Sequence, residues 1–118
     1  MRARDHRLFL QDILVSAREA QEFAQGMSLS EFLEDRKTQN AVVRSIEIIG
    51  EAAKNMPKSV RDKYPDIPWS DMARMRDKVA HGYWGVDYEI VWKVLVEELP
   101  ALIPKIEFAL QQEQGEDE

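Results

Sequence analysis

The chain has 118 residues, enough for one domain that buries roughly two-thirds of the surface its unfolded form exposes. It contains no cysteine and two histidines, which excludes a disulfide framework and a thiolate metal site and argues against a zinc or His-rich metal centre. Gln11 and Asp12 interrupt the apolar run after the basic N-terminus, and no apolar stretch approaches about eighteen residues. We therefore expect a soluble cytoplasmic protein with no export signal and no membrane span.

The net charge of −6 is unevenly distributed along the chain. Residues 1–83 carry 14 basic and 13 acidic side chains, whereas residues 84–118 carry 2 basic and 9 acidic ones. Residues 54–81 alone carry 7 basic and 4 acidic side chains. Because phosphate binding depends on local basic surface, the negative total does not exclude a nucleic-acid partner.

The first third of the chain predicts a long helix followed by a short one. Apolar side chains recur at three- and four-residue steps across residues 5–25, and Gly26 is placed to end that helix. Ser28 and Glu31 then have capping-box spacing for a second start. The side chains expected to face inward from the first helix are Leu10, Ile13, Leu14, Ala17, Ala20 and Ala24.

The middle third predicts a second long helix over residues 35–56, which Pro57 stops. Gly50 lies inside this helix and lowers its stability by about 1 kcal/mol relative to alanine. Close approach of another helix at this position would explain the glycine. A short helical turn over residues 58–64 precedes a Pro-rich corner, and residues 69–81 predict a third main helix ended by Gly82.

In the last third, a helical pattern starts again near Asp87, and its apolar stripe continues to Leu110. Pro100 and Pro104 lie inside this stripe, so we expect a kink or break near Glu98, with Pro100 in the first turn of the last helix. No segment shows clean alternation typical of a strand. The prediction is an all-α, four- to five-helix up-and-down bundle over residues 1–112, followed by an acidic tail at residues 113–118.

Residues 74–84 gather several cations, one histidine, a tyrosine and a tryptophan. The imidazole of His81 suits proton transfer near neutral pH, and the guanidinium of Arg76 matches phosphate oxygens, so together they suit a phosphodiester without a metal. Five residues on an ideal helix leave these two groups about 140° apart, so they share a face only if the helix ends at His81 or a second subunit contributes. A histidine at a helix C-terminus is also a favourable cation at the negative end of the dipole, and spacing does not decide between the readings.

The run from Arg76 and Asp77 through His81 to Tyr83 resembles the RxxxxHxY signature of HEPN domains. Ordered blocks that include and surround it, at residues 40–44, 48–53, 67–69, 75–77 and 81–87, resemble the HepT-like branch of that family. The resemblance covers residues 5–110 and implies the toxin of a two-gene, type VII toxin–antitoxin system. HepT-like toxins are ribonucleases that form homodimers, with the arginine and histidine of two protomers lining one cleft.

The resemblance also implies roles for single residues. Arg76 and His81 would be catalytic in attack of a ribose 2′-hydroxyl on the adjacent phosphate, with Asp77 and Tyr83 in support and no cofactor. The partner would be a minimal nucleotidyltransferase (MntA-type) antitoxin that uses ATP to attach AMP to a motif tyrosine, here Tyr83. Some relatives carry a tyrosine two positions after the arginine, where this chain has Lys78.

Other polar and aromatic residues have two readings each. Arg44 and Glu51 are either supporting groups of the site or members of surface ion pairs. Arg74 and Lys78 are either RNA-backbone contacts or solvated charges. Trp84 and Trp92 stack bases or, as we favour, lie at an interface.

A function from another class also fits these features. The chain could be a non-catalytic helical dimerisation module that binds and regulates a nucleotidyltransferase. Intact Arg76, His81 and Tyr83 favour the ribonuclease, whereas the acidic C-terminal part keeps the regulatory module open.

Overall fold

Every regular element of the structure is a helix. The structure is a computed structural model that describes residues 5–80 and 85–115. Within these ranges the extended pairing is limited to an isolated bridge between Ala80 and Val86. The prediction of an all-helical fold is confirmed. In the same ranges, no helix is both long and apolar enough to cross a membrane.

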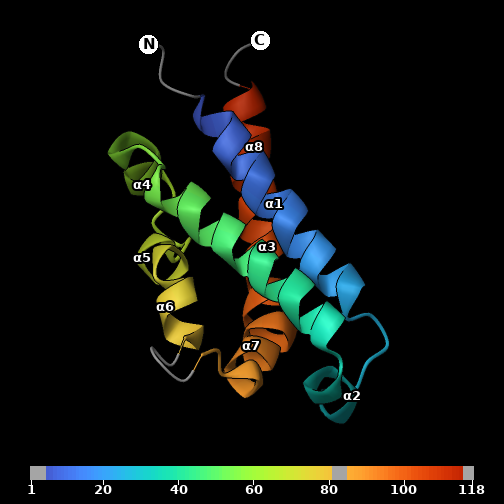
Figure 1. Ribbon diagram of the computed structural model, residues 1–118. Coiled ribbons are helices and arrows are strands. Elements are labelled where there is room, and N and C mark those ends of the chain that lie inside the picture. The colour runs from blue at the N-terminus through green and yellow to red at the C-terminus, as the bar shows by residue number, and fades with distance from the viewer. Residues whose placement is uncertain (1–4, 81–84, 116–118) are drawn as a thin grey trace.

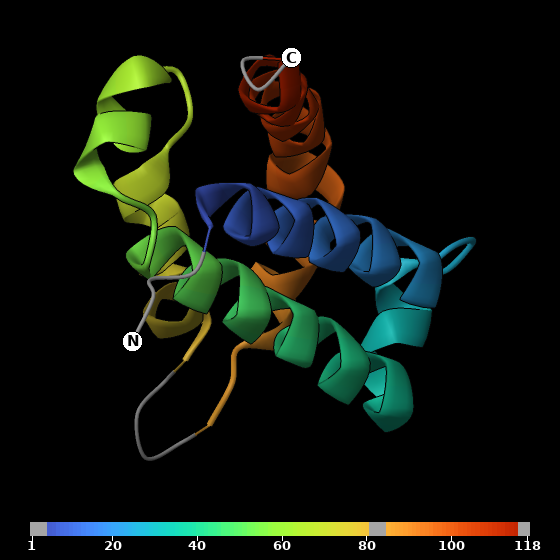
Figure 2. The ribbon, with the colours of Figure 1, turned by 90° about the horizontal axis from the view of Figure 1, so that it is seen from above.

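Three long helices form the body of the molecule: α1 (His6–Phe23), α3 (Arg36–Lys54) and α8 (Leu99–Gly115). Helices α1 and α3 lie side by side, and α8 packs against the other side of α1 (Figures 1 and 2). The apolar residues expected to face inward from α1 are all buried. The sequence period therefore predicted the core face correctly.

Short helices connect and cover these three. The connecting elements are α2 (Leu29–Glu34), α4 (Lys58–Lys63), α5 (Trp69–Ala73), α6 (Met75–Val79), α7 (Tyr88–Lys93) and the π-helix η2 (Val94–Glu98). Helices α4, α5 and α6 follow one another down one side of the molecule (Figure 1), and α5 and α6 both pack on α3.

Local capping explains where several helices begin. The side chain of Asp5 accepts a hydrogen bond from the backbone N–H of Arg7 at the start of α1. Ser28 forms the expected capping box with Glu31, and Asp35 caps α3 by accepting from Thr38. Such caps satisfy backbone N–H groups that have no partner within the helix.

The helix expected over residues 69–81 is interrupted. It is divided into α5 and α6 by Arg74, whose φ of −101° and ψ of 8° leave the helical region. The carbonyl oxygens of Met72 and Ala73 lie against Gly50 of α3, where an added Cβ would be 3.2 Å from the Met72 oxygen. Helix α6 then ends at Val79, because Ala80 is extended and pairs with Val86. Gly82, the expected terminator, lies outside the described residues.

The π-helix η2 lies at the expected irregularity near Glu98. The N–H of Leu99 donates to the carbonyl of Val94, five residues back, instead of to the carbonyl four residues back. Pro100 follows directly and has no N–H to continue the ordinary ladder, so the widened turn absorbs the mismatch before α8. Pro104 lies inside α8.

A buried carboxylate ties three helices together where α1 begins and α8 ends. Glu113 is 6% exposed and accepts from Tyr64 Oη at 2.6 Å, His6 Nε2 at 2.7 Å and Lys63 Nζ at 2.9 Å. Burial alone raises the pKa of this carboxyl group. The three hydrogen bonds outweigh burial, and the pKa lies below its ordinary value of 4.5.

Candidate functional site

Two of the four predicted site residues lie on α6. Arg76 and Asp77 are its second and third residues, and Met75 and Val79 of the same helix are buried in the core. The buried pair fixes the helix, so its polar residues face outward. His81 and Tyr83, and also Trp84, lie outside the described residues.

Arg76 presents an accessible guanidinium group. Its side chain is 71% exposed, and its Nε lies 3.9 Å from Oε1 of Glu47 on α3. A contact this long between exposed groups is a weak ion pair that contributes little to folding. The guanidinium therefore remains open to an anion such as a phosphate.

Glu47 lies between two arginines, and the sequence analysis missed it. Its Oε1 faces Arg76, while its Oε2 lies 3.5 Å from Arg44 Nη1, one helical turn away on α3. Glu47 is partly exposed at 33%. The only sequence signal for this residue was the three-residue spacing from Arg44, which is common among helix surface pairs.

Arg44, Glu47 and Glu51 line one groove between α1 and α3, together with Asp12 and Asn55. The sequence offers Arg44 and Glu51 as supporting groups of the site or as surface ion-pair members. Arg44 is linked to Arg76 through Glu47, whereas Glu51 accepts from Nδ2 of Asn55, the residue that caps the end of α3, at 3.4 Å. The structure thus joins Arg44 to the candidate site and gives Glu51 a partner of its own.

A second charged surface covers the outer side of α5 and α6. Asp71, Arg74, Asp77 and Lys78 line a shallow depression there. Arg74 lies 3.8 Å from Asp71, one turn away. Lys78 donates to Oε1 of Glu98 at 2.7 Å, which offsets its charge locally.

Trp92 is partly buried and packs against the core. Its ring centroid lies 5.3 Å from that of Phe32 on α2, a fully buried side chain. This contact gives Trp92 a packing role between α7 and α2. Among the residues described, no cluster of three His, Asp or Glu side chains is arranged to hold a metal ion.

Comparison of the sequence with known proteins identifies the family of this chain. The sequence model of the family described as ribonuclease HepT-like matches residues 13–109, which include α6 and the whole candidate motif. The chain belongs to this family of HepT-like ribonucleases.

Several proteins are similar over nearly their full length. A Methanocaldococcus jannaschii protein named as an RNase is 47% identical over 118 residues, covering 100% of this chain and 98% of that protein. A Thermococcus cleftensis protein named as a ribonuclease HepT is 46% identical, covering 88% and 94%. A Caldanaerobacter subterraneus protein named as an RNase is 42% identical, covering 91% and 96%. No solved structure matches the chain closely enough to count as a relative.

Proposed function

We propose that this chain is a metal-independent endoribonuclease in which Arg76 binds and stabilises the scissile phosphate and His81 transfers protons. Two facts support this proposal. The chain belongs to the HepT-like ribonuclease family, and the guanidinium of Arg76 is exposed and only weakly paired with Glu47. A fixed positive charge beside the phosphate stabilises the charge that develops in the transition state.

The proposed reaction is a transesterification. His81 removes the proton from a ribose 2′-hydroxyl, whose oxygen attacks the adjacent phosphorus while the bond to the 5′-oxygen of the next nucleotide breaks. The departing oxygen takes a proton, so the products are a 2′,3′-cyclic phosphate and a 5′-hydroxyl end. Asp77 orients the groups beside it.

A homodimer completes this proposed site. Arg76 and His81 are separated by five residues, and one chain then supplies one imidazole where the reaction needs both a base and an acid. Two chains placed with their motifs facing supply both. Exposed apolar side chains outside the core, including Leu8, Val15 and Phe23 on α1, are available for such contacts.

We further propose that the chain is the toxin of a type VII toxin–antitoxin system. Its partner is a minimal nucleotidyltransferase that transfers AMP from ATP to Tyr83. The added phosphate and adenosine block the RNA cleft by charge and volume.

The test is RNA cleavage by the purified chain, without added metal, with the new ends analysed. We expect cyclic phosphate and 5′-hydroxyl ends from the wild type and at least a hundredfold lower rate from His81→Ala. Undiminished cleavage by His81→Ala overturns the mechanism. No cleavage by the wild type, together with tight binding of the nucleotidyltransferase, favours the regulatory module instead.

Modification is tested separately by incubating the chain with its genomic neighbour and ATP. We expect the mass of one AMP to be added at Tyr83, and Tyr83→Phe to remain unmodified. A label on another residue refutes that assignment and leaves the nuclease mechanism standing.

A further inference from the structure

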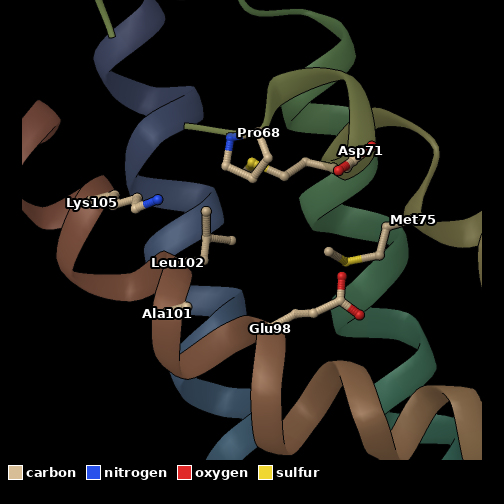
Figure 3. A pocket seen from close by; sticks show the side chains of 8 residues that line it. Pro68, Asp71, Met75, Glu98, Ala101, Leu102 and Lys105 are labelled. Atoms are coloured by element: carbon tan, nitrogen blue, oxygen red, sulfur yellow. The ribbon is translucent and has the colours of Figure 1, made fainter. Parts of the chain in front are cut away.

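A cavity of about 150 Å³ lies between α5, α6 and the start of α8 (Figure 3). Its walls are apolar and include Met72, Met75 and Leu102, while Asp71, Glu98 and Lys105 bring charge to it. The volume is below the roughly 300 Å³ at which drug-sized pockets begin. A cavity of this volume can hold one flat ring system.

Glu98 lines this cavity, and one of its oxygen atoms has no hydrogen-bond partner among the described residues. Its Oε1 accepts from Lys78 Nζ at 2.7 Å, but its Oε2 is buried and has no hydrogen-bond partner among the described residues. Figure 3 shows the carboxylate directed toward Met75. Buried carboxylate oxygens are normally hydrogen-bonded, so this one is suited to a ligand that brings an N–H donor.

The backbone that carries Glu98 is also irregular. Glu98 is the last residue of the π-helix η2, and π-turns occur often at functional sites. The widened turn sets Glu98 opposite α6, where Lys78 meets it.

The cavity adjoins the candidate nuclease site. Asp71 lines both the cavity and the depression formed by Arg74, Asp77 and Lys78. Met75 lines the cavity, and the next residue, Arg76, contacts Glu47 on α3. Helix α6 thus carries both Arg76 and one wall of the cavity.

The local charges favour a neutral ligand. Around the cavity Asp71 and Glu98 are balanced by Lys78 and Lys105, so neither a free anion nor a free cation is preferred. The two methionines, Met72 and Met75, offer polarisable contacts to an aromatic ring. A nucleobase combines this neutrality with a flat apolar face and a polar edge.

We propose that this cavity is a base-binding subsite that prefers guanine, a proposal that rests on the ribonuclease function above. Guanine presents two adjacent donors, N1–H and the N2 amino group, to the carboxylate of Glu98. Its O6 accepts from Lys78 Nζ, which has donors to spare. Adenine turns an acceptor, N1, toward the carboxylate, and the single N3–H of uracil is flanked by two carbonyl oxygens.

The proposal is tested by binding alone, which separates it from any failure of catalysis. The probes are 2′-O-methyl oligouridines, which lack the attacking hydroxyl, with one central guanine, hypoxanthine or adenine. We expect the guanine oligomer to bind roughly tenfold more tightly than the adenine oligomer, with hypoxanthine between them because it lacks the N2 amino group. Equal affinities of the wild type for the three oligomers overturn the proposal.

Variants assign the preference to the cavity. Glu98→Gln removes a negative charge and so raises affinity for any RNA, which makes the guanine-to-adenine ratio the decisive quantity. We expect that ratio to fall near one in Glu98→Gln and to persist in Glu97→Gln, a matched change at an exposed neighbour on the same π-helix. A ratio that persists in Glu98→Gln overturns the proposal.

A second variant leaves the buried polar contact untouched. Ala101 lines the cavity from an exposed position on α8, so Ala101→Leu narrows the cavity without disturbing the core. We expect it to lower affinity for the guanine oligomer several-fold and to leave affinity for plain oligouridine unchanged. Unchanged affinity for the guanine oligomer contradicts the proposal.

Discussion

Arg76 and Glu47 meet across two helices, with Nε of the guanidinium 3.9 Å from Oε1 of the carboxylate. Arg44 approaches the other oxygen of Glu47 at 3.5 Å. One carboxylate thus lies between two guanidinium groups beside the candidate site. On the proposed mechanism, this carboxylate helps to orient Arg76 and lowers the positive potential that an RNA phosphate meets.

These two effects predict a split outcome for Glu47→Gln. Loss of the negative charge strengthens RNA binding roughly two- to fivefold, which corresponds to a surface charge interaction of under about 1 kcal/mol. Loss of the orienting contact lowers kcat, so KM and kcat fall together. The matched control is Glu107→Gln on α8, which removes the same charge from a pair with Arg18. The same changes in that control would contradict a local role for Glu47.

Removing the guanidinium should damage activity and spare the fold. Because Arg76 is 71% exposed and its ion pair is long, we expect Arg76→Ala to change the free energy of unfolding by less than about 0.5 kcal/mol. We expect its cleavage rate to fall by about a hundredfold, as for loss of one transition-state donor. Arg74→Ala, an equally exposed neighbour, should lose only a few-fold in RNA affinity. Urea denaturation and single-turnover cleavage measure the two quantities, and equal losses of activity in both variants would argue against the assignment.

The close approach of α5 to α3 predicts the effect of Gly50→Ala. The new Cβ would lie 3.2 Å from the carbonyl oxygen of Met72, a backbone atom of a fully buried residue. Overpacking of this kind lowers the free energy of unfolding by about 1–3 kcal/mol. The higher helix propensity of alanine raises it by at most about 1 kcal/mol. We expect a net loss of about 1 kcal/mol, seen as a lower melting temperature. Gly115→Ala meets open space and should cost nothing, so equal effects of the two changes would refute this account of Gly50.

Stability should depend on pH through Glu113. The pKa of this carboxyl group is lower in the folded chain than its ordinary value of 4.5, so its contribution is complete above that value and is lost as pH falls through the folded-state pKa. Glu113→Gln, which cannot ionise, should be less stable than the wild type by about 2 kcal/mol at pH 7. The difference should narrow as pH falls below 4.5. Denaturation midpoints between pH 7 and pH 3 measure it, and a difference that stays constant would show that ionisation of Glu113 contributes nothing.

Local chemistry made much of the fold predictable from the sequence. The caps at Ser28 and Asp35 depend on side chains within three residues of the groups they bond, and the buried face of α1 follows from its own three- and four-residue spacing. The irregularity before Pro100 follows from one missing N–H group. Each of these features depends on interactions among residues that are close in sequence, so the local sequence suffices to predict it.

The candidate site could be predicted only in part. Arg76 and Asp77 were found because they stand in a recognisable run with His81 and Tyr83. Glu47 could not be found in this way because it lies 29 positions before Arg76 in the chain. Glu98 likewise lies 20 positions after Lys78, its partner in the structure. The carbonyl groups that precede the break at Arg74 pack against another distant residue, Gly50.

The sequence by itself determined the helical class, most helix boundaries and the run of residues suited to phosphodiester chemistry, because periodicity and capping act over a few residues. Only the tertiary structure decided which charges meet. It placed Glu47 between two arginines, set Glu98 at the wall of a cavity beside α6, and buried Glu113 among donors from α1 and the end of α4. These contacts arise where helices cross, and the crossing is set by the packing of side chains far apart in the chain.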